Sequence, residues 1–563
     1  MVGLRAKLSG EVLDSLARVW RTGPGRRATR LVKRFGLDLD QRPSVLLADL
    51  DRRLIARPGR RVAVFTDEAS RALPGALARW RPSIRAVHEY ADDERMHSTM
   101  TAAGPFDVII DATAATSAEK IDRLKRTRWH LRIGGRYLAR TSDLDGVLRP
   151  SGRAHQDLAA DFTKITRRHG LVQLTTGVTA MPKLRYEEVD QLVEARRLPR
   201  ATVVATLPAV TWDSRSRIST NKNYLRRRFP PQFEVPSLSL RAYDGVLCWP
   251  HQVLTMGGVL LPDSYRHFHS PRFNNHWLKV VEPNFAQYRR KRKKAVRLPG
   301  QYFYLGSEFP QHFGHVMTEQ VSRLWAWRAA KERYPDLKAL VSVSRVKDGL
   351  LPFEKAIFQA AGIAAEDLIG VKGFARVDQL LAAAPMFVNP AFIHPEIVDV
   401  WRPIGTALRS DAPEREYPEK IFASRRPARL KRRCHNTEEL ENRFRDRGFT
   451  IVYPEDYSMA EQAMIFDQAA VIAGFAGSGL FTMMFSERPK PVIMISSTSY
   501  TARNEYLIAS AIGHDLTVIY SIPDIHHPQG GWTNEAFQSP FTFDFEKEGR
   551  YLDQVLSRLS LNR

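Results

Sequence analysis

The sequence predicts an α/β protein with two Rossmann-like lobes, preceded by a helical segment and by a further Rossmann-like domain. Two observations predict this class. Short apolar runs that suit buried strands alternate with segments of helical period through most of the chain. Turns containing glycine follow several of these runs where a helix is expected to begin. With 563 residues, 43% of them hydrophobic, the chain is large enough for three or four domains with filled cores.

The first two parts of the chain are predicted to be residues 1–58 and 59–190. Residues 1–58 carry apolar side chains at helical spacing, such as Leu13 and Leu16, and are expected to form an amphipathic helical segment. From Arg61 the pattern changes to buried strands separated by helices, which predicts a small parallel sheet. The expected strands are 62–65, 106–111 and 136–138, and the expected helices are 70–80 and 118–131.

The later strands of this domain and the Gly134-Gly135 turn resemble the second half of a class I methyltransferase fold. Methyltransferases of that class carry a glycine-rich cofactor loop after their first strand. At that point this chain reads Thr66-Asp67-Glu68-Ala69-Ser70, which contains no glycine. We therefore expect the domain at 59–190 to be non-catalytic.

Two further lobes are predicted at residues 191–412 and 413–563, after a boundary near Pro199. In the first, the expected elements are strands at 302–305, 339–343 and 379–383 and a helix at 353–361. In the second, the expected elements are strands at 421–423, 450–453 and 470–473, and helices from Asn436 and from Met459. Asn436 is expected to cap its helix, and Gly448 to follow the end of that helix.

The second of these lobes contains a predicted anion site. A loop rich in arginine, beginning with Arg425 and Arg426, leaves the strand at 421–423. The glycine run at 474–479 leaves the strand at 470–473 and opens a helix, where free backbone amides attract negative charge. Because both loops follow parallel strands at their carboxyl ends, we expect them to bind one ligand, such as a nucleotide diphosphate.

These motifs resemble the C-terminal half of family 61 glycosyltransferases. The matching residues there are Ser424-Arg425-Arg426, the basic tract after them, Asn436, Glu439, Tyr453-Pro454-Glu455, Glu461-Gln462 and Gly477-Ser478-Gly479-Leu480. An earlier stretch, Phe313 to Glu319 followed by Arg323-Leu324-Trp325, is similar to the other signature of that family. The resemblance covers roughly residues 240–525. One departure is Ala476, which stands where many members have histidine.

The resemblance implies a bacterial enzyme of the capsular-polysaccharide type, with the type B glycosyltransferase architecture. Such an enzyme moves a sugar from a nucleotide-sugar donor to a polysaccharide or glycoconjugate acceptor, with inversion. Donor-binding residues are then expected at Arg425, Arg426, Arg433, Asn436, Gln462, Gly477, Ser478 and Gly479. No cofactor is expected beyond the nucleotide sugar, which is a co-substrate.

His315 and Glu319 are the candidate catalytic residues. Their spacing of four places them on one face of a helix, where their side chains can meet. An imidazole oriented by a carboxylate is a suitable general base for a sugar hydroxyl. The resemblance supports this role, because both residues lie in the first signature.

No metal site is expected. Asp-x-Asp pairs, which hold a divalent ion in transferases of another fold type, occur at 38–40, 49–51 and 143–145. All three lie outside the region of resemblance, and we interpret them as solvated turns or helix faces. The charge of the leaving diphosphate is then expected to be stabilised by Arg425, Arg426 and the helix that opens at Gly477.

The net charge of +24 favours polyanionic neighbours. Dense basic clusters occur at Arg226-Arg227-Arg228 and from Arg289 to Lys294. We interpret the second cluster as a solvated patch that contacts the headgroups of an anionic membrane or a phosphorylated acceptor. A nucleic-acid-binding protein or RNA methyltransferase is the alternative. It predicts a glycine-rich cofactor loop and aromatic residues among the basic clusters, and neither is seen, so no nucleic-acid partner is expected. A non-catalytic scaffold built from degenerate enzyme domains is a third hypothesis.

The remaining features concern the cellular compartment. The two cysteines, Cys248 and Cys434, are far apart and lack metal-ligand spacing, which favours a reducing cytoplasm. No apolar run is long enough to span a bilayer, and the N-terminus lacks a continuous apolar signal core. We expect a cytoplasmic protein, with its membrane contact at the inner face.

Overall fold

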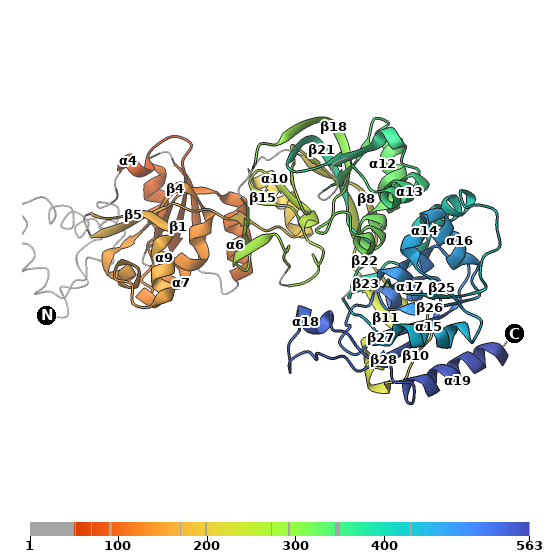
Figure 1. The fold of residues 1–563 in the computed structure, drawn as a ribbon. Helices are drawn as coiled ribbons and strands as arrows, with labels where there is room; N and C mark the ends of the chain where they lie inside the picture. The colour runs from red at the N-terminus through yellow and green to blue at the C-terminus, as the bar shows by residue number, and fades with distance from the viewer. Residues whose placement is uncertain are drawn as a thin grey trace, which may run out of the picture. The chain divides into compact units, whose positions relative to one another are not determined.

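The computed structural model describes residues 50, 52–68, 70–80, 82–88, 93–168, 170–196, 200–271, 273–290, 293–343, 349–426 and 431–561. The chain divides into two compact units (Figure 1). Unit 1 holds the chain up to Pro199 together with Gly257–Pro262 and Leu278–Arg290, and unit 2 holds the rest. Almost all of the predicted helical segment 1–58 lies outside the described residues, apart from a short helix, α4 (Arg52–Ile55).

Unit 1 is built on a six-stranded sheet of order β2-β1-β3-β4-β6-β5. Its strands are β1 (Arg61–Thr66), β2 (Ser83–His88), β3 (Phe106–Asp111), β4 (Leu131–Arg140), β5 (Phe162–Arg168) and β6 (Leu171–Thr176). Strands β2, β1, β3 and β4 are parallel, whereas β6 is antiparallel to both β4 and β5. The predicted parallel strands are confirmed. The prediction missed β2 and the β5–β6 hairpin, whose strands are partly polar on one face.

Helices cover both faces of this sheet. They are α5 (Leu73–Ala78), α6 (Asp93–Ala103), α7 (Ser117–Thr127) and α9 (Arg153–Ala160), and α10 (Val189–Arg196) packs against α6. Alternate residues of the central strands enter two separate apolar clusters, as in β1, where Ala63 and Phe65 belong to one and Val62 and Val64 to the other. A smaller sheet of β7 (Met181–Pro182), β16 (Leu278–Glu282) and β17 (Phe285–Tyr288) completes the unit.

Unit 2 contains two large sheets, and the first is mixed. Its strands are β8 (Ala201–Leu207), β12 (Leu238–Asp244), β13 (Leu247–Trp249), β14 (Val253–Met256), β18 (Val296–Leu305), β19 (Lys338–Ser342), β20 (Leu368–Val371) and β21 (Ala375–Ala383). Strands β21, β18, β19 and β20 run parallel, as predicted for a Rossmann-like lobe. Strands β12 and β13 pair with β21 in the antiparallel sense. Strands β12 and β13 follow one register along β21, interrupted only at Gly245 and Val246, and this antiparallel part of the sheet was not predicted.

The second sheet of unit 2 is wholly parallel, with the order β10-β28-β27-β26-β24-β25. Its strands are β10 (Ile218–Thr220), β24 (Lys420–Ala423), β25 (Thr450–Val452), β26 (Val471–Phe475), β27 (Pro491–Ser497) and β28 (Asp515–Ser521). The predicted strands of this lobe are confirmed. Strand β10 differs from the predicted boundaries, because it lies in the range assigned to the preceding lobe and pairs with β28.

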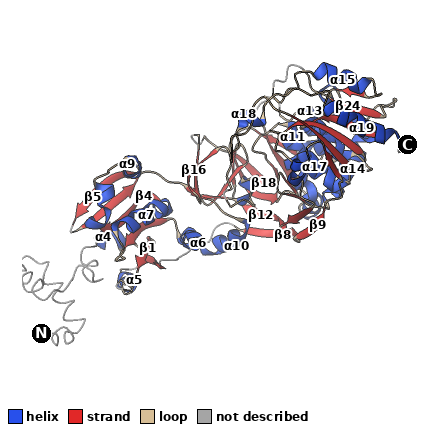
Figure 2. Cartoon of the chain, turned by 90° about the horizontal axis from the view of Figure 1, so that it is seen from below, coloured by secondary structure: helices blue, strands red, loops and turns tan. Residues whose placement is uncertain are grey.

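Helices lie on both faces of the second sheet (Figure 2). They are α14 (Ile397–Ser410), α15 (Thr437–Arg445), α16 (Met459–Gln468), α17 (Asn504–Ile512) and α19 (Glu548–Leu561). Leu440 and Phe444 of α15 and Leu552 of α19 pack with Phe422 and Ile493 of the strands in one apolar cluster. Burial of these side chains, at roughly 1.5–3 kcal/mol each, is the main force that holds the helices to the sheet. Gly448 follows α15 with φ of 78°, as predicted.

Among the described residues, no helix has the length and apolar character required to cross a membrane. Both cysteines are buried free thiols.

Candidate functional site

One large cavity of unit 2 has a volume of about 610 Å³, which is in the usual range for ligand sites. Segments that follow the carboxyl ends of β18, β26, β27 and β28 contribute to its walls. The residues that the argument uses are Gln252, Arg266, His312, His315, Glu319, Lys431, Arg432, Gly477, Ser478, Tyr500, Trp532, Phe537 and Gln538. Ligands of open α/β sheets bind beyond the carboxyl ends of the strands, so this cavity is the candidate site.

On one wall, His315 and Glu319 form a hydrogen-bonded pair. The Nδ1 atom of His315 lies 2.6 Å from Oε1 of Glu319, and the Nε atom of Arg266 donates to the same oxygen at 2.5 Å. Burial alone would raise the pKa of Glu319, but the charges of Arg266 and His315 and the hydrogen bonds from both hold it well below its usual range. The ionised carboxylate fixes the Nδ1–H tautomer of His315, which leaves Nε2 as the proton acceptor.

The backbone around this pair departs from a regular helix. Phe313–His315 is a short α-helical turn (α11), and Val316–Gln320 continues it as a π-helical turn, a feature often found at functional sites. The ring of Phe309 stacks on the His315 imidazole with centroids 4.7 Å apart. The guanidinium carbon of Arg266 lies 5.4 Å from the centroid of the Phe309 ring. A Cβ atom at Gly314 would lie 3.2 Å from the Cβ of Ser478, so glycine allows the close approach of this turn to the glycine run.

On the opposite wall, Arg432 is the arginine that faces the cavity. It has a left-handed backbone conformation, with φ of 54°, and its backbone N–H donates to the carbonyl of Gln538 at 2.9 Å. Its guanidinium carbon lies 5.0 Å from the Tyr500 ring centroid and 5.6 Å from that of Phe537. Its Nε atom is buried and has no hydrogen-bond partner among the described residues, and the same holds for Oε1 of Gln538. An unpaired buried donor that lines a cavity indicates a place for a ligand acceptor.

Strained backbone also concentrates at this cavity. Within the described parts of the chain, the non-glycine residues with positive φ are His251, Gln252, Gln311 and Arg432. Gln252 and Arg432 line the cavity, His251 precedes Gln252, and Gln311 precedes His312. Such conformations cost on the order of 1–3 kcal/mol each and persist where the surrounding structure imposes them, often at functional sites.

The predicted donor-binding arginines Arg425, Arg426 and Arg433 line a neighbouring cavity of about 400 Å³ instead. Arg425 donates to the carbonyls of Ala476 and, at 3.1 Å, of Arg432, so it ties the basic loop to the glycine run. Arg426 forms a half-exposed ion pair with Asp456 and lies over the Tyr453 ring. Arg425 thus has a structural role in this conformation. The basic side chains of this loop that line the large cavity are Lys431 and Arg432, and Arg432 also lines the neighbouring cavity.

Two other predicted residues have their hydrogen-bonding groups occupied within the lobe. Asn436 stands at the predicted N-cap position of α15, but its side chain exchanges two hydrogen bonds with the backbone of Phe543 and makes no cap hydrogen bond. The buried Gln462 amide donates to the carbonyls of Pro454 and Tyr457. These two amides position backbone segments, and neither they nor Gly479 line the large cavity.

The glycine run lines the cavity through Gly477 and Ser478, but its geometry differs from the predicted anion seat. Ser478–Phe485 is a 3-10 helix (η12) rather than an α-helix. The Gly477 N–H donates to the buried carboxylate of Glu505, so this amide is occupied by the protein itself. Burial raises the pKa of Glu505, which also accepts the Tyr500 hydroxyl at 3.1 Å. Glycine is required at 477, because a Cβ there would lie 2.6 Å from Nη2 of Arg425.

Sequence reasoning missed Arg266 and did not single out Arg432 from the basic tract. Arg266 lies 53 residues from Glu319, in a stretch of short strands and turns, and no local spacing connects the two. The signal that was available is composition: Arg266 stands among aromatic and histidine residues just after a buried strand.

The described Asp-x-Asp pair, at 143–145, gives no sign of a metal site. In the one that is described, Asp143 pairs with Lys120 at 2.5 Å. The acidic residues of the pairs at 38–40 and 49–51 lie outside the described residues. Within the described ranges, no group of three or more His, Cys, Asp or Glu side chains is arranged to hold a metal ion.

At the carboxyl end of the unit 1 sheet, several polar side chains bond to other groups of the protein. Asp67 accepts hydrogen bonds from Ser70 and, at 2.5 Å, from the backbone of Ala114. Behind it, Arg123 and Asp111 form a buried ion pair at 2.6 Å.

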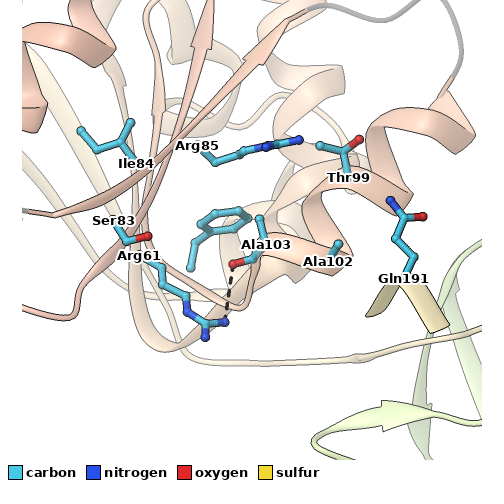
Figure 3. Close-up of a pocket in the computed structure, with 9 residues that line it drawn as sticks. Arg61, Ser83, Ile84, Arg85, Thr99, Ala102, Ala103 and Gln191 are labelled. Atoms are coloured by element: carbon cyan, nitrogen blue, oxygen red, sulfur yellow. Dashed lines mark hydrogen bonds between the residues drawn. The ribbon is translucent and has the colours of Figure 1, made fainter. Parts of the chain in front are cut away.

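A cavity of about 400 Å³ in unit 1 lies at the opposite, amino ends of β1 and β2 (Figure 3). One of its two arginines, Arg61, donates to the carbonyls of Gly104, at 2.5 Å, and Ala103. Because open α/β sheets bind ligands at the carboxyl ends of their strands, this cavity is not where a cofactor is expected.

Comparison with known proteins gives a family match within unit 2. Residues 313–493 match the family described as Glycosyltransferase 61, a stretch that includes His315, Glu319, Arg432 and the glycine run. The comparison with curated protein sequences found no match.

Among solved structures, the chain is similar at 15% identity to the MycE methyltransferase from the mycinamycin biosynthetic pathway, in complexes with Mg and SAH. The TM-scores are 0.17 and 0.18, and the match covers 21% or 22% of this chain. It spans 45% or 46% of the solved chains, which is less than half of their length, and at such TM-scores it carries no argument about fold or activity. The family match alone bears on function: residues 313–493 are similar to a glycosyltransferase domain, which supports glycosyl transfer as the general activity.

Proposed function

We propose that the protein transfers a hexose or pentose from a nucleotide-sugar donor to a polysaccharide or glycoconjugate acceptor, with inversion and without a metal ion. The observation that carries the proposal is one cavity with two chemically different walls. A histidine oriented by a carboxylate lies on one wall, and an arginine with an unpaired buried N–H lies on the other. The family match over residues 313–493 supports the same activity.

In this proposal the two sheets of unit 2 correspond to the two lobes of the type B architecture. The acceptor hydroxyl binds beside His315, and the donor diphosphate binds beside Arg432, with Lys431 and Ser478 nearby. Unit 1 has no catalytic role, and the protein works in the cytoplasm.

The reaction is a single displacement. As the acceptor oxygen forms its bond to the anomeric carbon, its proton passes to Nε2 of His315, and Glu319 stabilises the resulting imidazolium. The bond from the anomeric carbon to the diphosphate oxygen breaks, and its electron pair leaves with the diphosphate. The guanidinium of Arg432 and the ammonium of Lys431 stabilise the negative charge that develops there.

The assignment of Arg432 revises the role expected for Arg425 and Arg426. Arg425 holds the basic loop against the carbonyl of Ala476, so its effect on the donor is indirect. The alanine at 476 contributes a backbone carbonyl at this point, and the contact that a histidine makes in many family members is replaced by this bracket.

The experiment that tests the proposal is a screen of nucleotide sugars for nucleotide release, with and without glycan acceptors. We expect release from one or a few donors by the wild-type chain, and a loss of release in the His315→Ala variant with nucleotide binding retained. Release that is unchanged in His315→Ala, or no turnover and no binding of any nucleotide sugar by the folded protein, would contradict the proposal.

A further inference from the structure

A patch of exposed apolar and basic side chains borders the candidate site. It comprises Tyr224, Arg226, Arg227, Ile522 and Ile525, and we call it the Ile522 face. The side chains of Tyr224 and Ile522 are 61% and 62% exposed, and that of Ile525 is 48% exposed. Arg226 and Arg227 are also exposed, and neither forms an ion pair within the part of the chain that the structure describes. Exposed apolar side chains that occur together beside charge mark interaction surfaces.

Sheet topology places the two segments of this face side by side. Tyr224, Arg226 and Arg227 follow β10, and Ile522 and Ile525 follow β28. Strands β10 and β28 are parallel neighbours, so the segments that follow them leave the sheet at the same edge (Figure 1). The Asn221 side chain fixes this arrangement through two hydrogen bonds with the backbone of Tyr520. The segment after β10 forms the 3-10 turn Asn223–Arg228 (η6) that carries Tyr224 and both arginines.

The same contacts connect the face to the large cavity. Arg228 donates to the carbonyl of Tyr500 at 3.4 Å, and Tyr500 lines the cavity. The carbonyl of Ile525 accepts from the Ser499 hydroxyl at 3.0 Å. The chain then continues to Trp532, a 58% exposed side chain at the cavity wall. The Ile522 face is therefore part of the rim of the candidate site.

We propose that the Ile522 face binds an anionic lipid bilayer. Apolar side chains that can enter the acyl boundary, beside arginines that meet anionic headgroups, are the two elements of an interfacial membrane contact. The net charge of +24 favours approach to such a surface from solution. Two acidic groups occur in the neighbouring segment, namely Asp524, which lies 2.7 Å from His435, and the exposed Glu535 of α18 (Asn534–Phe537), while the face itself carries the charges of Arg226 and Arg227.

Lipid is favoured over nucleic acid because of the apolar members of the face. A nucleic-acid surface needs several aromatic faces that stack on bases, whereas this face carries one tyrosine, Tyr224, beside two isoleucines that offer apolar volume without a stacking plane. Contact of this rim with a bilayer would turn the cavity toward substrates held at the membrane. The inference does not depend on glycosyl transfer, and vesicle binding is measured without turnover.

The test is co-sedimentation of the full chain with vesicles. We expect binding to vesicles of phosphatidylcholine mixed with phosphatidylglycerol, little binding to phosphatidylcholine alone, and weaker binding at high salt. Arg226→Ala with Arg227→Ala should weaken binding by about tenfold or more, because each basic side chain near an anionic bilayer adds roughly a fivefold gain. Tyr224→Ser with Ile522→Ser should weaken it several-fold at unchanged charge. The matched control is Val203→Ser with Arg328→Ala, two exposed positions on other elements of unit 2, which should bind like the wild type.

Three outcomes would overturn the proposal. The first is no preference for anionic vesicles. The second is loss of binding on substitution of Arg289 and Arg290, with the Ile522 face variants unaffected. The third is that single-stranded RNA binds the chain and displaces it from vesicles, with a dependence on Arg226 and Arg227 but none on Tyr224 and Ile522. Circular dichroism and thermal unfolding of each variant establish that it is folded before binding is compared.

Discussion

Replacing Arg432 with Met should slow sugar transfer strongly while the protein stays folded. At an effective dielectric constant of about 20, a guanidinium about 4 Å from a phosphate oxygen contributes about 4 kcal/mol. Loss of water from the buried Nε offsets part of this gain. We therefore expect a loss of about 2–4 kcal/mol in transition-state stabilisation, which is roughly 30- to 800-fold in kcat/KM. Met keeps the apolar contact with the rings of Tyr500 and Phe537, so the change is chiefly one of charge.

The assay is nucleotide release together with urea unfolding, with two neighbouring arginines as controls. Arg425→Met removes charged hydrogen bonds to two carbonyls, so we expect it to lower the free energy of unfolding by about 2–4 kcal/mol. Arg426→Met breaks a half-exposed ion pair and should change stability and kcat/KM by no more than about 1 kcal/mol. A kcat/KM for Arg432→Met within about threefold of wild type, a change worth less than 1 kcal/mol, would refute the reasoning, as would an equal loss in Arg426→Met.

Other predictions concern the cavity wall that carries His315 and Glu319, and the independence of the reaction from a metal ion. His315→Ala should lower kcat by about two to four orders of magnitude with nucleotide affinity nearly unchanged, and Glu319→Gln should do less; isothermal titration with the nucleotide separates the two effects. Arg266→Met should raise the pKa of Glu319 toward its usual range and leave the carboxylate charge to His315 alone, so the acid limb of the kcat/KM profile should move to higher pH. The pKa of Glu319 is lower in the folded protein than in the unfolded chain, so its ionisation contributes stability in full above the unfolded pKa of about 4.3, and this contribution is lost as the pH falls below that value. The difference in the free energy of unfolding between wild type and Arg266→Met, measured in urea, should therefore shrink at lower pH. Transfer should survive EDTA, and abolition with rescue by manganese or magnesium would contradict metal independence.

Much of the second sheet of unit 2 could be predicted because buried parallel strands are continuous apolar runs. All five residues of β26 are buried, and its run is visible in the sequence. Strand β10 was missed because it has only three residues and its partner β28 lies almost three hundred residues later. No local sequence pattern predicts a pairing over such a separation. The antiparallel pairing of β12 and β13 with β21 was not predicted for a related reason, since β21 lies far along the chain from both strands.

The candidate site follows the same division between local and distant contacts. His315 and Glu319 could be paired from sequence because a helical turn brings residues four apart together. Arg266, which shares the Glu319 carboxylate, could not be found, because its position depends on the packing of a separate segment. Composition also could not say which arginine of the basic tract faces the cavity, because that choice depends on the left-handed backbone at Arg432.

The glycine run illustrates how one motif can support a different physical role from the expected one. Glycines after a strand were expected to leave amides free for an anion, yet the Gly477 N–H is held by the carboxylate of Glu505. What glycine provides at 477 is room for the Arg425 guanidinium to reach the carbonyl of Ala476. That bracket fixes the basic loop, and the loop directs Arg432 into the cavity. The buried carboxyl of Glu505 also interacts electrostatically with the Arg432 guanidinium. A diphosphate bound beside Arg432 would therefore compete with Glu505 for this guanidinium and would further disfavour ionisation of the Glu505 carboxyl. The proposed donor site is therefore better described as a cation, Arg432, in a loop held by Arg425 than as a ring of backbone amides.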